Sequence, residues 1–174
     1  MSARAARHSS YDLRELIPHA LRMCLLDTIE IWDESSIHCL TNSHRDPENP
    51  LRSGQQLAAL HLCEYGAQAM AVHGGLLARH EHGGKAGPGV LVALREVEFA
   101  VDRVDDIEEP LTVIAHQQIA GANGWLYRFE VNAGSRWLAR GRVSVIHPSK
   151  KRPEALFEAS KQLHALGTKN DSTA

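Results

Sequence analysis

One carboxylate within an apolar helical pattern is the first candidate for chemistry in this sequence. Glu64 lies in a run from Gln55 to Leu77 that has almost no polar face, and a helix of this kind is usually buried inside its domain. Burying a carboxylate costs roughly several kcal/mol unless the group is paired, hydrogen-bonded or kept protonated. An acid whose pKa is raised by burial is suited to proton transfer near neutral pH. The alternative is a thin solvent-facing seam on which Glu64 has no chemical role.

Two further polar side chains, His61 and Gln68, form a narrow polar stripe with Glu64 on the predicted helix. His61, Glu64 and Gln68 follow the spacing i, i+3 and i+7 of one helix face, and no lysine or arginine lies among them. His61 is either a partner that orients Glu64 or a core histidine. Gly66 costs about 1 kcal/mol relative to alanine in a helix and indicates close approach of another backbone or a ligand. The sequence has no HExxH motif and no cysteine pair at zinc spacing, so we expect no metal.

Length and composition narrow the class of protein. A chain of 174 residues predicts one domain with a substantial core. Its net charge of −2 does not indicate the excess of positive charge that nucleic-acid binding requires. We find no apolar stretch near the roughly 18 residues of a membrane span and no secretory signal at the start. Cys24, Cys39 and Cys63 have unrelated spacings, which is typical of buried thiols in a reducing compartment. We therefore expect a cytoplasmic protein.

The elements around the helix are predicted mainly as strands. Alternating or apolar patterns predict strands at 25–32, 37–41, 90–101, 111–120, 125–132 and 136–147. Asn123-Gly124 and Ala133-Gly134 predict hairpins that join the last three strands into an antiparallel meander. Ser53 is a candidate N-cap of the central helix, and Gly74 and Gly75 should weaken its end. Residues 1–10 are expected to be disordered, with a helical turn at 11–16. A short helix at 153–166 and a frayed tail follow the domain, within 149–174.

One architecture satisfies all of these elements. An antiparallel sheet that curls around one buried helix covers the helix on every side, and it makes residues 11–148 a single α+β domain. Such a sheet usually needs a partner to complete its burial. We therefore expect a homodimer.

The order of elements is similar to the hotdog fold, and three motifs resemble those of 3-hydroxyacyl-[acyl-carrier-protein] dehydratases. The N-terminal signature is matched by Leu16-Ile17-Pro18-His19 followed by Leu25-Leu26-Asp27. The helix motif E-Y-x-A-Q-A of the branch associated with aryl polyene pathways resembles Glu64-Tyr65-Gly66-Ala67-Gln68-Ala69. The loop from Ser43 to Pro50 lies where the family carries its catalytic histidine. The resemblance covers residues 11 to 148.

The resemblance implies dehydration of a 3-hydroxyacyl thioester, held by acyl carrier protein or CoA, to the trans-2-enoyl thioester. It implies that His44 is the base, that Glu64 kept protonated by burial is the acid, and that opposite subunits supply the two. Amides near Ala58 and Ala59, at the start of the helix, would polarise the thioester carbonyl. Gln68 would orient the site, and neither metal nor redox cofactor is required.

Departures from the family pattern keep alternatives open. The housekeeping enzymes carry G-H-F-P-G-x-P, whereas here Ser43 precedes His44 and Arg45 and Asp46 follow it. His19 is therefore an alternative catalytic histidine. The competing functions are a hotdog thioesterase and a non-catalytic subunit that binds an active hotdog partner or a carrier protein. An acidic carrier protein would require a basic rim, for which the candidates are Arg95, Arg103, Lys150, Lys151 and Arg152.

Overall fold

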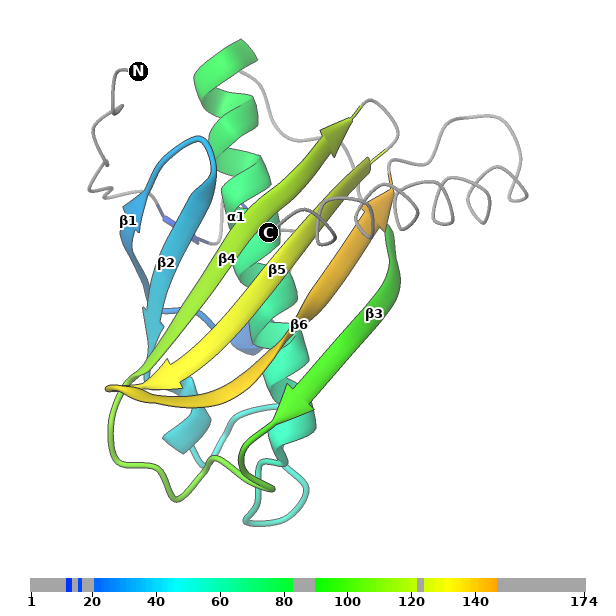
Figure 1. Ribbon diagram of the computed structural model, residues 1–174. Helices are drawn as coiled ribbons and strands as arrows, with labels where there is room; N and C mark the ends of the chain where they lie inside the picture. The colour runs from blue at the N-terminus through cyan, green and yellow to red at the C-terminus, as the bar shows by residue number, and fades with distance from the viewer. Residues whose placement is uncertain (1–11, 14–15, 17–20, 83–89, 122–123, 147–174) are drawn as a thin grey trace.

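A six-stranded antiparallel sheet wraps one face of a single long helix (Figure 1). The computed structural model describes residues 12–13, 16, 21–82, 90–121 and 124–146. The predicted disordered N-terminus, most of the turn at 11–16, and the predicted C-terminal helix and tail lie outside the described residues. Within those limits, the hotdog architecture predicted from the sequence is confirmed.

In the described part of the chain the strands and the long helix follow the predicted order, and short 3₁₀ helices (η) precede or connect them. They are η2 (Leu21–Met23), β1 (Thr28–Trp32), β2 (Ser36–Thr41), η3 (Ser43–Arg45), η4 (Ala59–His61), α1 (Leu62–His82), β3 (Val90–Phe99), β4 (Leu111–Gly121), β5 (Gly124–Ala133) and β6 (Arg136–Ile146). The strand order in the sheet is β1-β2-β4-β5-β6-β3. The last three strands form the predicted meander, while β3 crosses to the far side of β6 and becomes an edge strand.

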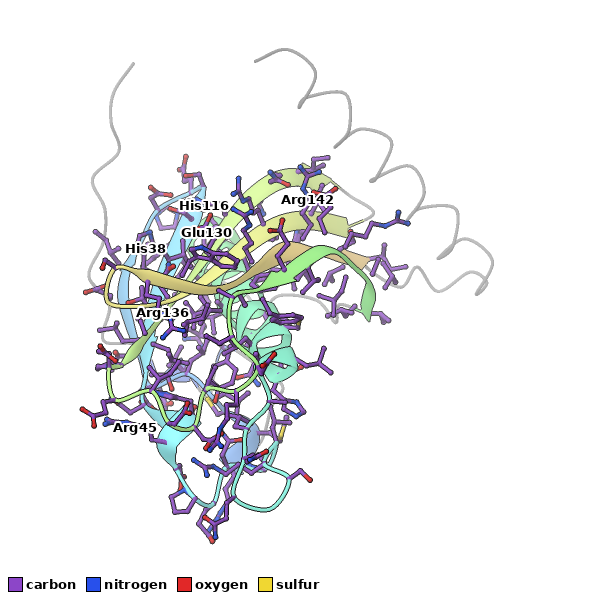
Figure 2. The ribbon with its side chains drawn as sticks, turned by 60° about the horizontal axis from the view of Figure 1, so that its bottom comes forward. His38, Arg45, His116, Glu130, Arg136 and Arg142 are labelled. Atoms are coloured by element: carbon purple, nitrogen blue, oxygen red, sulfur yellow. The ribbon has the colours of Figure 1, made fainter. Side chains whose placement is uncertain are left out.

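Alternation along the strands separates an apolar face from a polar one. Tyr127 and Phe129 of β5 are buried against α1, whereas Arg128 between them is exposed. Side chains such as His116 and Glu130 lie on the opposite, outer face of the sheet (Figure 2). Strands β2, β4, β5 and β6 thus pack a buried face against the helix, as the period of two predicts, whereas β3 has no buried side chain.

Close contacts between glycines and aromatic rings set the distance between helix and sheet. A Cβ atom on Gly66 would lie 2.5 Å from Cγ of Phe129, and one on Gly74 would lie 2.6 Å from Cζ3 of Trp125. A close approach at Gly66 was predicted for another backbone or a ligand, whereas the group that approaches is the aromatic side chain of Phe129. We expected Gly74 to weaken the end of the helix. The helix nevertheless continues beyond Gly74 as far as His82.

The start of the helix differs from the prediction. The α-helix begins at Leu62 rather than at Gln55, and Ser53 is not its N-cap because it pairs in an isolated bridge with Gln56. Ala58 is extended and pairs with a distant segment through the bridge Ala58↔Arg103, and η4 begins at the next residue, Ala59. The side chains of Leu57 and Ala59 on either side of it are buried in the core, whereas Ala58 is exposed. None of the helices in the described part of the chain combines the length and hydropathy that a membrane span requires.

Candidate functional site

The polar stripe on α1 is formed by Glu64 and Gln68. Gln68 is fully buried, and its Nε2 donates to Oε1 of Glu64 at 3.0 Å and to the carbonyl of Met23 at 2.7 Å. Its Oε1 accepts from the backbone N–H of Leu25 at 2.9 Å. Gln68 therefore attaches the 23–25 segment to the helix and orients the Glu64 carboxyl group. Glu64 itself is half-buried, so its expected full enclosure is wrong for the single chain, and His61 in η4 is half-buried as well.

His44 lies in η3 with its side chain fully buried. Its Nε2 is 3.0 Å from the carbonyl oxygen of Ile107. Because a carbonyl can only accept, Nε2 carries the hydrogen and Nδ1 of the neutral ring carries the lone pair. This Nδ1 is buried and has no hydrogen-bond partner among the described residues. His44 thus presents a buried proton acceptor to which none of the described residues donates a hydrogen bond.

The surroundings of His44 favour the neutral ring. Burial lowers the pKa of His44 below its ordinary value of 6.5, and the hydrogen bond to Ile107 opposes this effect. The positive charges of Arg45 and Arg52 lower the pKa further. The imidazole is therefore neutral at pH 7, which is the form that a general base requires.

Hydrogen bonds hold the loop that carries His44. The Tyr65 hydroxyl lies 2.9 Å from Oγ of Ser43, and Nδ2 of Asn49 donates to it at 3.0 Å. The same Asn49 amide donates to the Ser43 carbonyl at 2.8 Å, and Arg52 donates to the His44 carbonyl at 3.0 Å. The loop is therefore fixed on both sides of the imidazole.

The segment before the helix provides fewer free amides than predicted. The N–H of Ala59, a predicted donor to a thioester carbonyl, already donates to the Asp102 carbonyl at 2.9 Å. Ala58 is exposed. Its N–H takes part in neither of the two neighbouring backbone hydrogen bonds, which join Ala59 to Asp102 and Val104 to Leu57. The N–H of Ala58 therefore stays a predicted donor to the thioester carbonyl. The Asp105 carboxylate accepts a hydrogen bond from the N–H of Leu57 at 2.7 Å and so holds the start of this segment.

Other predicted residues are distributed as follows. His19 and the residues 150–152 lie outside the described part of the chain. Arg95 is exposed, whereas Arg103 already pairs with Asp105 and Asp106 and therefore offers less free charge to a carrier protein than expected. Among the described residues, no group of three or more His, Cys, Asp or Glu side chains could hold a metal ion.

Several contributors to the site were missed from the sequence. The missed residues contact groups that are distant in the sequence or lie within an irregular loop, so no local pattern reveals them. Ile107 and Arg52 contact His44, and Asn49 contacts Tyr65. The fully buried His73, which bonds to Tyr127 at 2.8 Å, was also overlooked, although its position between Val72 and Gly74 in an apolar helix was a usable signal. His73 belongs to the packing of α1 against β5.

Comparison with known proteins agrees with the geometry. The model of the ApeP-like family, described as ApeP dehydratase, matches residues 11–158. The chain belongs to the ApeP-like family. The dehydratase resemblance found in the sequence is therefore confirmed at family level. No protein among the curated sequences matches the chain significantly.

Solved structures show the same fold as this member of the ApeP-like family. The dehydratase heterocomplex ApeI:P from Xenorhabdus doucetiae contains a chain with a TM-score of 0.72 at 18% identity, covering 82% of this chain and 94% of that one. AziG from S. sahachiroi gives a TM-score of 0.55 at 20% identity, covering 76% and 97%. A thioesterase-like protein from Silicibacter sp. TM1040 gives 0.52 at 14% identity, covering 70% and 78%. At these identities the likeness establishes the hotdog fold alone.

Proposed function

We propose that the protein is a 3-hydroxyacyl thioester dehydratase, a hydro-lyase of fatty-acid or aryl polyene type biosynthesis, acting on chains bound to acyl carrier protein or CoA. Membership of a dehydratase family supports the reaction class. The observation that carries the proposal is the neutral His44 with its Nε2–H bound to Ile107 and its buried Nδ1, for which the described residues supply no hydrogen-bond partner. An unsatisfied buried acceptor is costly in a folded protein, and such groups often belong to reactive sites.

The residues match the proton transfers that dehydration needs. Nδ1 of His44 would take the proton from C2 of the acyl chain, and the carboxylic acid form of Glu64 would give a proton to the departing 3-hydroxyl. The C2–H and C3–O bonds break, a C2–C3 double bond forms, and water leaves. Transfer of the proton from the imidazolium back to the carboxylate resets the site. The N–H of Ala58 would polarise the thioester carbonyl.

A second hotdog protomer would complete this site. Strand β3 has no strand partner on its outer edge among the described residues, and it exposes the apolar side chains of Val90, Leu91, Leu94 and Phe99. Exposed apolar side chains on an open edge indicate a docking surface. The Xenorhabdus relative is named as a heterocomplex, so the partner of this chain is either a second copy or another hotdog protein.

One observation favours a second function. His44 is fully buried in the single chain, so a substrate reaches Nδ1 only when the loop shifts on binding of substrate or partner. A hotdog subunit that supports an active partner without turning over substrate itself would have no need of that movement. Thioester hydrolysis is the other competing reaction, and it differs in releasing free thiol instead of an enoyl thioester.

The test uses the purified protein, alone and with a hotdog partner, and a 3-hydroxyacyl thioester substrate. We expect the enoyl thioester to form without release of free thiol. Glu64→Gln and His44→Ala should each abolish turnover while circular dichroism shows an intact fold, whereas His116→Ala on the outer face should leave turnover unchanged. Near-normal activity of His44→Ala would refute the proposed base, and loss of activity only in His19→Ala would transfer that role to His19.

A further inference from the structure

The hydroxyl of Tyr65 connects the central helix to the loop that carries His44. Tyr65 directly follows Glu64 on α1 and is fully buried. Its oxygen contacts Ser43, the residue before His44, at 2.9 Å, and Asn49, five residues after His44, at 3.0 Å. One oxygen atom on the helix therefore touches the loop on both sides of the imidazole.

The directions of the hydrogen bonds follow from the chemistry of the partners. Oγ of Ser43 lies 2.6 Å from the Leu25 carbonyl, which can only accept, so Ser43 donates to it. Tyr65 then donates to Ser43, and the Asn49 amide donates to Tyr65. The chain from Asn49 through Tyr65 and Ser43 to Leu25 runs in one direction, and each hydrogen in it has one acceptor. Buried networks that are satisfied in this way are rigid.

We propose that Tyr65 is a positioning residue: its hydroxyl, acting through Ser43 and Asn49, fixes the His44 loop relative to the helix that carries Glu64. This inference rests on the proposed function only in naming His44 as the base. If an assembly pairs His44 of one protomer with Glu64 of another, each α1 helix serves two sites. It carries Glu64 of one site and, through Tyr65, holds the His44 loop of the other. A displacement of about 1 Å in such an arrangement can reduce a rate about 100-fold.

The variant Tyr65→Phe removes only this link. Ser43 keeps the Leu25 carbonyl and Asn49 keeps the Ser43 carbonyl, so the loop is loosened without losing its backbone acceptors. Tyr127→Phe is a matched control, because the Tyr127 hydroxyl is also buried and hydrogen-bonded, to Gln117 at 2.8 Å and to His73 at 2.8 Å. Both variants lose one buried phenol hydroxyl, and only one of these touches the His44 loop.

Two measurements decide the role. We expect kcat of Tyr65→Phe to fall about 10-fold with little change in KM, and kcat of Tyr127→Phe to stay close to that of the wild type. Loosening the loop should also hydrate the imidazole. Since burial is the main cause of the lowered pKa of His44, its titration, followed by NMR, should move to higher pH in Tyr65→Phe, and the acidic limb of kcat/KM should move with it.

The outcomes separate this inference from the proposed function. Equal losses of kcat in the two tyrosine variants, with an unchanged titration of His44, would overturn the role of Tyr65. Ser43→Ala supplies a further check, because its effect should not add to that of Tyr65→Phe if both break one chain of hydrogen bonds. Absence of turnover in the wild type would refute the proposed function alone, and the titration of His44 would still decide whether Tyr65 positions the loop.

Discussion

Replacing Gly66 by alanine should destabilise the protein, although alanine is the better helix former. The ideal Cβ at this position lies 2.5 Å from Cγ and 2.6 Å from Cδ2 of Phe129. The Phe129 ring cannot retreat, because its far side faces Gly141, where a Cβ would lie 2.9 Å from Cε1. The ring is thus confined between a glycine on α1 and a glycine on β6, and the helix must move to accommodate a methyl group.

The magnitude follows from two opposing effects. Alanine gains about 1 kcal/mol over glycine in a helix interior. Overpacking of a core costs about 1–3 kcal/mol and occasionally more, and two ring atoms inside 2.7 Å place Gly66→Ala at the upper end. We therefore expect a net loss of about 1–2 kcal/mol, which lowers the urea midpoint by about 0.5–1 M at an m-value of about 2 kcal/mol/M.

Chemical denaturation of matched variants measures this effect. Gly74→Ala places its Cβ 2.6 Å from the outer ring of Trp125, which is half-buried and can turn toward solvent, so the loss should be clearly smaller. Phe129→Leu removes the ring, and in its background Gly66→Ala should cost much less than in the wild type. A Gly66→Ala protein that is as stable as the wild type would refute the confinement of the ring.

Two further predictions concern charge and association. Hydrogen bonding from Arg103 lowers the pKa of Asp105 from 3.8 to about 2. Its contribution to stability is therefore present above about pH 4 and is lost as the pH falls toward 2, and Asp105→Asn should flatten the dependence of the urea midpoint on pH over this range. If β3 is the proposed docking edge, Leu94→Glu should dissociate the assembly in analytical ultracentrifugation while leaving the circular dichroism spectrum unchanged; an unchanged sedimentation coefficient would refute the assignment of this edge.

Local patterns predicted the meander and the middle of the helix because those elements depend on neighbouring residues. The two predicted hairpin connections are confirmed by the pairing of Gly121 with Gly124 and of Ala133 with Arg136. Each turn differs from the predicted dipeptide, because Gly124 and Ala133 are paired strand residues, and residues 122–123 lie outside the described part of the chain. The alternation of β5 identified its buried face correctly. Turn chemistry and a period of two are short-range signals that packing reinforces.

The start of the helix was predicted seven residues early because its cause is distant in the sequence. Leu57 and Ala59 fit a helical apolar pattern, yet their backbone groups bond to Val104 and Asp102, and Ala58 between them is extended. The environment of His44 was hidden for the same reason, since Ile107 lies 63 residues away. A histidine in a polar loop looks exposed in the sequence, and only the tertiary structure shows that it is buried.

The helix motif that carries the family resemblance has a separate physical role at each of its distinctive positions. Glu64 presents the carboxyl group, Tyr65 holds the His44 loop, and Gln68 holds the 23–25 segment. Gly66 admits the Phe129 ring, which lets the helix lie close enough to the sheet for these attachments to form. One turn of α1 therefore fixes two segments that precede it in the chain. Since none of the three supporting residues has a proton-transfer role in the proposed reaction, their substitution should degrade the geometry around Glu64 and His44 while leaving both side chains present.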